Sequence, residues 1–106
     1  MTIAPPRRVV MGQAQGPDVE LQVEGDEWYA TYETPAGDPA VYDDRRGLFC
    51  YARIKDGRFE STGVPITDPR PSDAAPPHAR EIPEVRAEKA AAQREKRAGQ
   101  ARKETS

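Results

Sequence analysis

Apolar side chains recur at every second position in the middle of the chain. Residues 19–23 alternate apolar and polar side chains. Residues 48–55 place Leu48, Cys50, Ala52 and Ile54 on one side and aromatic or basic side chains on the other. A period of two is typical of strands whose two faces meet different surroundings. Residues 28–34 are rich in aromatic and β-branched side chains, which favour strands. With a short strand near residues 40–42, the pattern predicts four to five antiparallel strands within residues 18–66.

Turn residues separate these runs and indicate how the strands connect. Asp56 and Gly57 form a two-residue loop between two strand candidates. This pair matches the type I′ hairpin turn, because Asp and Gly tolerate the positive φ angles that this turn requires. Gly25-Asp26 and residues 43–47 offer further turns. The expected fold is therefore mainly β, a small antiparallel meander.

The flanking segments have a different composition. Residues 1–17 contain Pro and Gly and are expected to be a flexible lead-in, and residues 67–83 are a Pro-rich linker that favours extended backbone over helix. Residues 84–106 form a charged tail of good helix formers whose apolar residues after Val85 are alanines. Without an apolar stripe to bury, this tail is expected to be disordered or weakly helical and not a packed element.

Composition and charge narrow the classes of partner. The chain has 106 residues, of which 36% are hydrophobic and 32% charged, so only one small domain is expected. Residues 1–79 hold 8 Lys and Arg against 13 Asp and Glu, a net charge of −5, whereas residues 80–106 hold 8 against 5, a net charge of +3. Acids surround the aromatic residues, and glutamates interrupt the basic tail. Nucleic acid therefore ranks last among the expected partners.

The location of the protein follows from two absences in the sequence. No apolar run of about 18 residues is present, so no membrane partner or span is expected. The first ten residues lack the apolar stretch of a secretory signal. As written, the chain is expected to be cytoplasmic.

The search for catalytic and metal-binding motifs is negative. No His-Glu-x-x-His, Gly-x-Ser-x-Gly, P-loop or Gly-x-Gly-x-x-Gly occurs. His78, the single histidine, lies in the Pro-rich linker and is expected to be exposed with nothing to hold it. Cys50, the single cysteine, lies among apolar alternate positions and is expected to be a buried, inert thiol. We therefore expect no enzyme, no cofactor and no metal site.

The acidic and aromatic residues leave two interpretations open. The acid pairs 26–27 and 43–44 lie at predicted turns, where turn formation explains them better than acid–base chemistry. The aromatic residues either fill the core or form a docking face, and if both faces of the sheet carry them, a partner is expected to cover one face. The candidate partner-binding residues are Asp26, Glu27, Trp28, Tyr29, Tyr32, Asp43, Asp44, Phe49 and Tyr51.

An ordered set of short motifs within residues 18–66 resembles a known family. The motifs are Gly25-Asp26-Glu27-Trp28-Tyr29, Tyr32-Glu33-Thr34, Gly37, Val41-Tyr42-Asp43, Gly47-Leu48-Phe49-Cys50-Tyr51-Ala52 and Ser61-Thr62-Gly63-Val64-Pro65. Their order and spacing resemble the N-terminal pro-region of the immune inhibitor A family of secreted zinc metallopeptidases.

The resemblance implies a β-rich pro-segment that assists folding of a zinc metallopeptidase and shields its active-site cleft. The zinc-binding motif of that family has no counterpart here, so peptidase activity does not transfer. Inhibition would occur by a turn carboxylate reaching the open position of a catalytic zinc, or by steric blocking. The alternative function is a stand-alone protein-interaction adaptor that uses its aromatic sheet face for docking.

Overall fold

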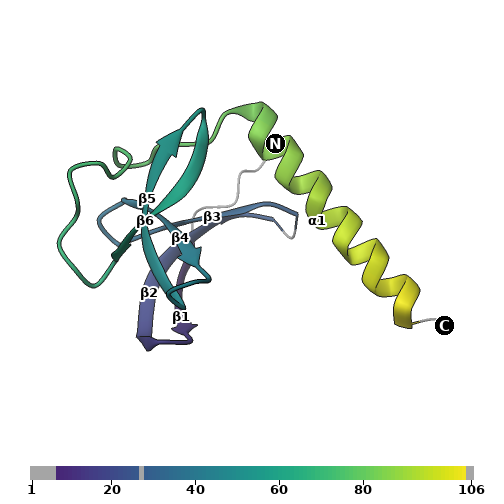
Figure 1. Ribbon diagram of the computed structural model, residues 1–106, viewed down its shortest axis with the longest axis horizontal. Helices are drawn as coiled ribbons and strands as arrows, with labels where there is room; N and C mark the ends of the chain where they lie inside the picture. The colour runs from purple at the N-terminus through teal and green to yellow at the C-terminus, as the bar shows by residue number, and fades with distance from the viewer. Residues whose placement is uncertain (1–6, 27, 105–106) are drawn as a thin grey trace.

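The computed structural model describes residues 7–26 and 28–104, with side chains described as far as residue 98. It contains one antiparallel sheet whose six strands lie in chain order, followed by one helix (Figure 1). The mainly β meander is confirmed, with one strand more than the upper number predicted. The elements are β1 (Arg7–Gln13), β2 (Gly16–Gly25), β3 (Ala30–Glu33), β4 (Pro39–Asp43), β5 (Leu48–Lys55), β6 (Arg58–Pro65) and α1 (Pro83–Glu104).

The β5–β6 hairpin forms as its loop residues predict. Asp56 and Gly57 have φ angles of 53° and 75°, so both occupy the left-handed region that a type I′ turn requires. Ile54 pairs with Phe59, and Lys55 pairs with Arg58. The two-residue loop therefore sets the register of the hairpin.

The sixth strand comes from the predicted lead-in. The expectation that residues 1–17 are flexible is wrong for residues 7–17, because β1 pairs with β2 along its length. Val9 lies opposite Leu21 and Met11 lies opposite Val19, so the alternation of the core continues into β1. Residues 1–6 lie outside the described residues.

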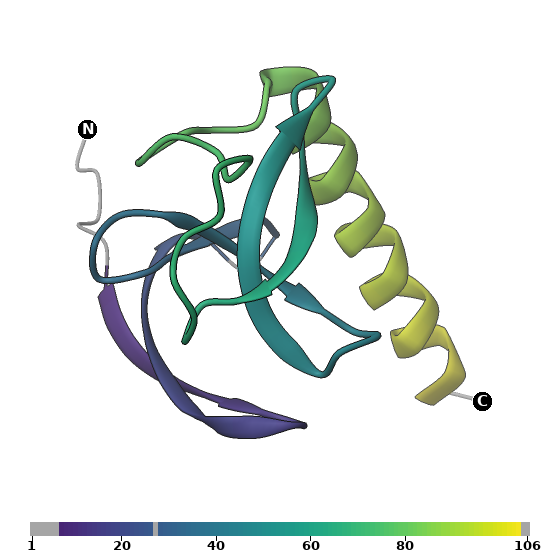
Figure 2. The same cartoon turned by 60° about the vertical axis from the view of Figure 1, so that its left-hand side comes forward.

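The sheet curls so that its first hairpin approaches the start of β5 (Figure 2). Gln15 donates its backbone N–H to the Gly47 carbonyl at 3.0 Å, and the Phe49 N–H donates to Gln13 Oε1 at 2.6 Å. The curl encloses an inner core of Val19, Leu21, Ala40 and Phe49, with Val9, Met11, Tyr32 and Ile66 packed against it. Aromatic side chains of the middle strands therefore fill the inside of the sheet.

The outer face of the sheet is covered by residues 67–82, which were expected to be a linker. Their backbone N–H groups at Ala75, His78 and Ile82 donate to carbonyl groups of the sheet and its turns. A second core lies beneath them, formed by Ala52, Phe59 and Ala75 with Val41 and Ala79. An irregular segment of the same chain therefore covers part of the face for which a partner is predicted, and the partner itself stays a prediction.

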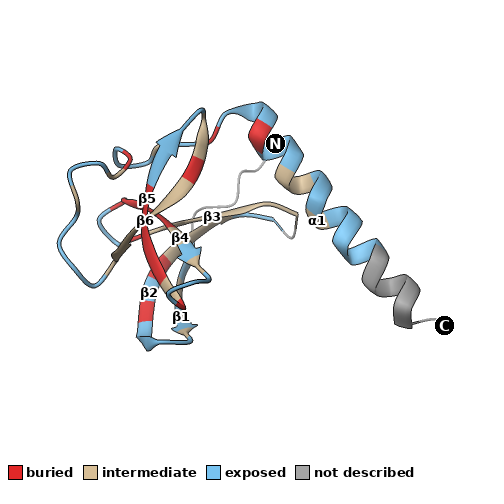
Figure 3. Cartoon of the chain, viewed as in Figure 1, coloured by how far each residue is buried: buried red, intermediate tan, exposed pale blue. Residues whose placement is uncertain are grey.

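The charged tail, which is predicted to be disordered or weakly helical, forms a helix. In α1, Val85 is 6% exposed, whereas the residues that follow are mostly polar and exposed (Figure 3). The first turn is thus packed, which differs from the expectation of an unpacked tail, because Pro83 and Val85 continue directly from the covering segment. No helix among the described residues is long and apolar enough to cross a membrane.

Candidate functional site

The sheet is split between β3 and β4. These strands pair only at Tyr32 with Ala40 and at Glu33 with Pro39. On either side of the split, β2 and β3 remain paired as far as Ala30, and β4 and β5 remain paired as far as Asp43. The middle of the sheet therefore opens while both of its halves stay intact.

The split leaves backbone groups without ladder partners. Thr34 and Asp38 are joined by a backbone hydrogen bond of 2.8 Å at the β3–β4 turn. Hydrogen-bonded pairs recur at every second position of an antiparallel ladder, so the next such pairs would be 32 with 40 and then 30 with 42. The ladder ends before the last of these. Within the described chain, Ala30 directs its N–H and C=O groups toward β4, and Tyr42 directs its own toward β3, but these groups have no ladder partner across the split.

A cleft of about 260 Å³ lies at this split. Residues 30–32 of β3 and 40–42 of β4 form two of its walls, and α1 contributes Lys89 and Gln93. The remaining lining side chains are Trp28, Tyr29, Phe59 and Glu81. Aromatic rings and small side chains dominate the walls, so the cleft suits an apolar or mixed ligand.

Glu81 joins the cleft to both the sheet and the helix. Its side chain is 2% exposed and accepts hydrogen bonds from the Tyr29 hydroxyl at 2.7 Å and the Phe59 N–H at 2.8 Å. Lys89 Nζ lies 2.6 Å from the same carboxylate. Burial alone would raise the pKa of Glu81, but the hydrogen bonds from Lys89, Phe59 and Tyr29 outweigh it and lower the pKa. Burial and the adjoining carboxylate raise the pKa of the Tyr29 hydroxyl.

Trp28 forms one end of the cleft beside α1. The guanidinium carbons of Arg94 and Arg97 lie 5.3 and 4.9 Å from the centre of its ring, within the range of cation–π attraction. Asp26 fixes the preceding turn, since its Oδ1 accepts the N–H groups of Trp28 at 2.9 Å and Tyr29 at 3.0 Å. These two hydrogen bonds lower the pKa of Asp26. The turn therefore places the indole against the helix.

The structure brings together three of the predicted partner-binding residues, Trp28, Tyr29 and Tyr32, at the cleft. Asp26 lies at the adjoining turn, and Glu27 lies outside the described residues. Phe49 and Tyr51 are buried in the sheet.

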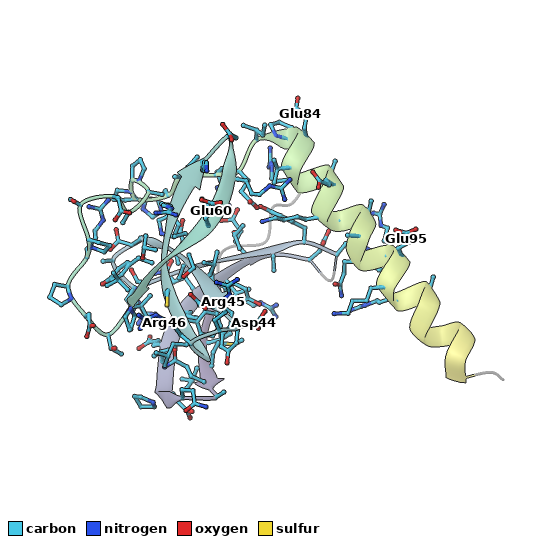
Figure 4. The ribbon with its side chains drawn as sticks, in the orientation of Figure 1. Asp44, Arg45, Arg46, Glu60, Glu84 and Glu95 are labelled. Carbon is cyan, nitrogen blue, oxygen red and sulfur yellow. The ribbon has the colours of Figure 1, made fainter. Side chains whose placement is uncertain are left out.

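The other predicted acids are Asp43, the last residue of β4, and Asp44, which follows it in the β4–β5 turn and is labelled in Figure 4. Asp43 Oδ1 accepts the N–H groups of Arg45 and Arg46, while Oδ2 accepts the Ser61 hydroxyl at 2.7 Å. The Ser61 hydrogen bond, followed by that of the Arg46 N–H, lowers the pKa of Asp43. Asp44 is exposed. The carboxylate of Asp43 thus accepts hydrogen bonds from its own turn and from β6.

Nine of the twelve residues that line the cleft are not in the predicted set of partner-binding residues, and five of these nine are aromatic, charged or amide side chains. Tyr42 and Phe59 belong to the aromatic set, but the alternation alone does not say which aromatics reach the split. Glu81, Lys89 and Gln93 lie in polar stretches, where nothing separates a buried charge from a solvated one. The nearest sequence signal is Pro83, a residue favoured at the first position of a helix, which marks where the chain turns into α1.

The prediction for the cysteine is confirmed, whereas the prediction for the histidine is confirmed only for its exposure. Cys50 is 0% exposed, and burial raises the pKa of its thiol, so the predicted buried thiol is confirmed. The His78 side chain is 69% exposed, as expected, but its Nδ1 lies 3.0 Å from Glu33 Oε1 and its backbone N–H donates to Gly37. Among the described residues, no group of three or more His, Cys, Asp and Glu side chains is arranged to hold a metal ion.

Comparison of the chain with protein-family models, curated proteins and solved structures gave no match. The resemblance to the immune inhibitor A pro-region therefore stays a prediction.

Proposed function

We propose that this protein is a non-catalytic protein-binding module and that the cleft between the split sheet and α1 is its binding site. The observation that carries the proposal is the opening between β3 and β4, where backbone groups of Ala30 and Tyr42 face a space lined by aromatic side chains. Unpaired strand groups next to apolar walls match the chemistry of a polypeptide ligand.

The polar groups of the cleft support binding and not acid–base catalysis. The Glu81 carboxylate already accepts from Tyr29, Phe59 and Lys89. A general base must reach the substrate proton and have a pKa near the working pH, whereas the Glu81 side chain is 2% exposed and its pKa is lowered. The network instead holds α1 at a fixed place along the cleft.

Selection of linear nine-residue peptides from a displayed random library tests the proposal. We expect binders whose affinity falls at least tenfold in Gln93→Trp, because Gln93 lines the cleft and an indole there fills the space. Glu95→Trp is the matched control. Glu95 is exposed on the same helix and points away from the sheet in Figure 4, so this variant should bind as the parent does.

Two outcomes would overturn the proposal. One is a selection that yields no binder, and the other is a set of binders that Gln93→Trp and Glu95→Trp affect equally. Circular dichroism of both variants checks that each retains the fold.

Shielding of a zinc metallopeptidase is the second candidate, supported by the motif resemblance over residues 18–66. The carboxylate of Asp26 accepts hydrogen bonds within its own turn, and that of Asp43 accepts from its own turn and from Ser61 of β6, which favours steric coverage over ligation of zinc. Titration into an immune inhibitor A-type peptidase with a peptide substrate tests this candidate. If the titration gives no inhibition and no complex at micromolar concentration, this candidate is ruled out in favour of the adaptor.

A further inference from the structure

This inference rests on the proposed function and concerns the chemistry of the partner. We propose that the cleft binds an extended, acidic peptide segment of another protein, which enters as an added strand between β3 and β4. Its backbone pairs with Ala30 and Tyr42, and an acidic side chain of the segment lies at the Trp28 end, beside Arg94.

The cleft lies between two strands of one sheet, which favours an extended ligand over a helical one. A strand is narrower than a helix, and it enters a sheet edge through the hydrogen bonds that the sheet leaves open.

The backbone groups at the split define the pairing of such a strand. In an antiparallel or parallel ladder, a residue offers both its N–H and its C=O to one side at every second position. Ala30 and Tyr42 stand at these positions on the two facing strands, just beyond the last pair of the existing ladder. An inserted strand therefore receives hydrogen bonds from both walls, which a single sheet edge does not provide.

The charges at the cleft favour an acidic segment. Arg94 stacks on Trp28, and within residues 7–26 and 28–98 no residue accepts a hydrogen bond from its guanidinium group. Among the described residues, Asp26 interacts electrostatically with Arg94, but its Oδ1 is occupied by its own turn. Guanidinium groups bind carboxylates through paired N–H donors, so an Asp or Glu side chain of the ligand suits this position.

Backbone N-methylation of the selected nine-residue peptides tests the strand pairing. N-methylation removes one N–H donor at a time. We expect losses of affinity of about tenfold at adjacent positions of the segment that enters the split, because successive residues pair with β3 and with β4 in turn, and little change outside that segment. Losses spaced by three or four residues, or none at any position, would overturn the inference.

Paired charge variants on α1 test the acidic partner. We expect Arg94→Gln to lower the affinity for acidic binders about fivefold and to weaken its salt dependence, since an exposed ion pair is screened. Lys96→Gln makes the same change of charge at an exposed residue that does not line the cleft, and should have little effect. Equal effects of the two variants, or binders without Asp or Glu, would overturn the acidic specificity.

The same experiments separate this inference from the proposed function. Peptides that respond to Gln93→Trp but lose no affinity on N-methylation of adjacent positions leave the binding module standing and remove the strand pairing. Analytical ultracentrifugation tests a second copy of the chain as the occupant. A dimer that Gln93→Trp dissociates and Glu95→Trp does not would overturn the choice of another protein as the partner.

Discussion

Glu81 is a carboxylate placed almost entirely out of solvent, and its surroundings explain why it is ionised there. Burying a charge is unfavourable unless donors replace the lost water. The donors come from three elements: Tyr29 from the turn before β3, Phe59 from β6 and Lys89 from α1. One side chain thereby connects three parts of the molecule at the edge of the cleft.

Removing this carboxylate should destabilise the fold. We expect Glu81→Ala to lower the free energy of unfolding by about 3 kcal/mol, because a buried donor left unpaired costs about 1–3 kcal/mol. Glu60→Ala is the matched control, since Glu60 pairs with Arg53 at the surface and such pairs contribute about 0–1 kcal/mol. Urea unfolding followed by circular dichroism measures both. Equal stability of Glu81→Ala and the parent would contradict the role given to this network.

Three carboxyl groups predict how stability depends on pH. The pKa values of Asp26, Asp43 and Glu81 are lowered in the folded state. The unfolded chain therefore binds more protons in acid, so their contribution is complete above the unfolded values near 4 to 4.5 and is lost as pH falls through the folded-state values. We expect the free energy of unfolding to decline steadily below about pH 4.5.

The Glu81→Gln variant separates the contribution of Glu81 to this pH dependence from the contributions of Asp26 and Asp43. Its free energy of unfolding should fall less steeply than that of the parent between about pH 4.5 and pH 2.5, because one titrating group is gone. Parallel curves for the two proteins would show that Glu81 does not contribute to the acid sensitivity.

The site could be predicted from the sequence only in part, and the reason lies in individual residues. Trp28, Tyr29 and Tyr32 stand out because large aromatic side chains are few and need surroundings of their own. Glu81 and Lys89 resemble solvated charges until the covering segment places them face to face. The split depends on where the pairing of β3 and β4 stops, and no residue type in the sequence marks that point.

At the scale of elements, the β5–β6 hairpin provides a sharp test of local geometry. Gly57 has a φ of 75°, and a Cβ atom added there would lie 2.7 Å from side-chain carbons of Ile82. We expect Gly57→Ala to lower the free energy of unfolding by about 1–2 kcal/mol, the cost of the left-handed backbone for a residue with a Cβ. Urea unfolding measures this change.

Two further variants separate the backbone and side-chain causes of the stability loss in Gly57→Ala. Asp56→Asn should stay within about 0.5 kcal/mol of the parent, because Asn-Gly is a preferred pair in this turn. Adding Ile82→Ala to Gly57→Ala should recover the part that comes from contact with Ile82. No recovery would assign the whole loss to the backbone of the turn.

The strands were predicted to the extent that their alternation is visible. Runs at 19–23 and 48–55 and the Asp56-Gly57 loop lead directly to β2, β5 and β6. The first strand was missed because Pro and Gly surround it and its apolar positions are few. Residues 67–82 were missed as a cover because an irregular segment satisfies its backbone by scattered hydrogen bonds, which leave no period in the sequence.

The whole molecule consists of one sheet with a core on each face, and the chain covers both. The inner core depends on the curl of the sheet, and the outer core depends on residues 67–82 crossing it. The polar composition of the flanks is therefore compatible with packing, because short apolar contacts such as those of Ala75 and Ala79 suffice where the backbone is held.

Hydrogen exchange should show that this covering segment unfolds together with the sheet. The N–H groups of Ala75, His78 and Ile82 donate to the carbonyls of Ala52, Gly37 and Gly57 at 2.8 to 3.0 Å. We expect these amides to exchange as slowly as those of the central strands, since they open only when the outer core does. Two-dimensional NMR after transfer to heavy water measures each amide.

The amide of Asp73 is the internal control for this experiment, because the structure gives it no acceptor among the described residues. It should exchange quickly. Rapid exchange at all four positions would mean that residues 67–82 behave as a linker after all.

The stacking of Trp28 has a practical consequence for the whole molecule. The chain contains one tryptophan, so its near-ultraviolet emission comes chiefly from a single indole. That indole lines the cleft and carries two guanidinium groups of α1 against its ring. Any event that lifts the helix or fills the cleft changes the polarity around one chromophore. The protein therefore contains its own optical probe, positioned where an arriving ligand would be seen without a label.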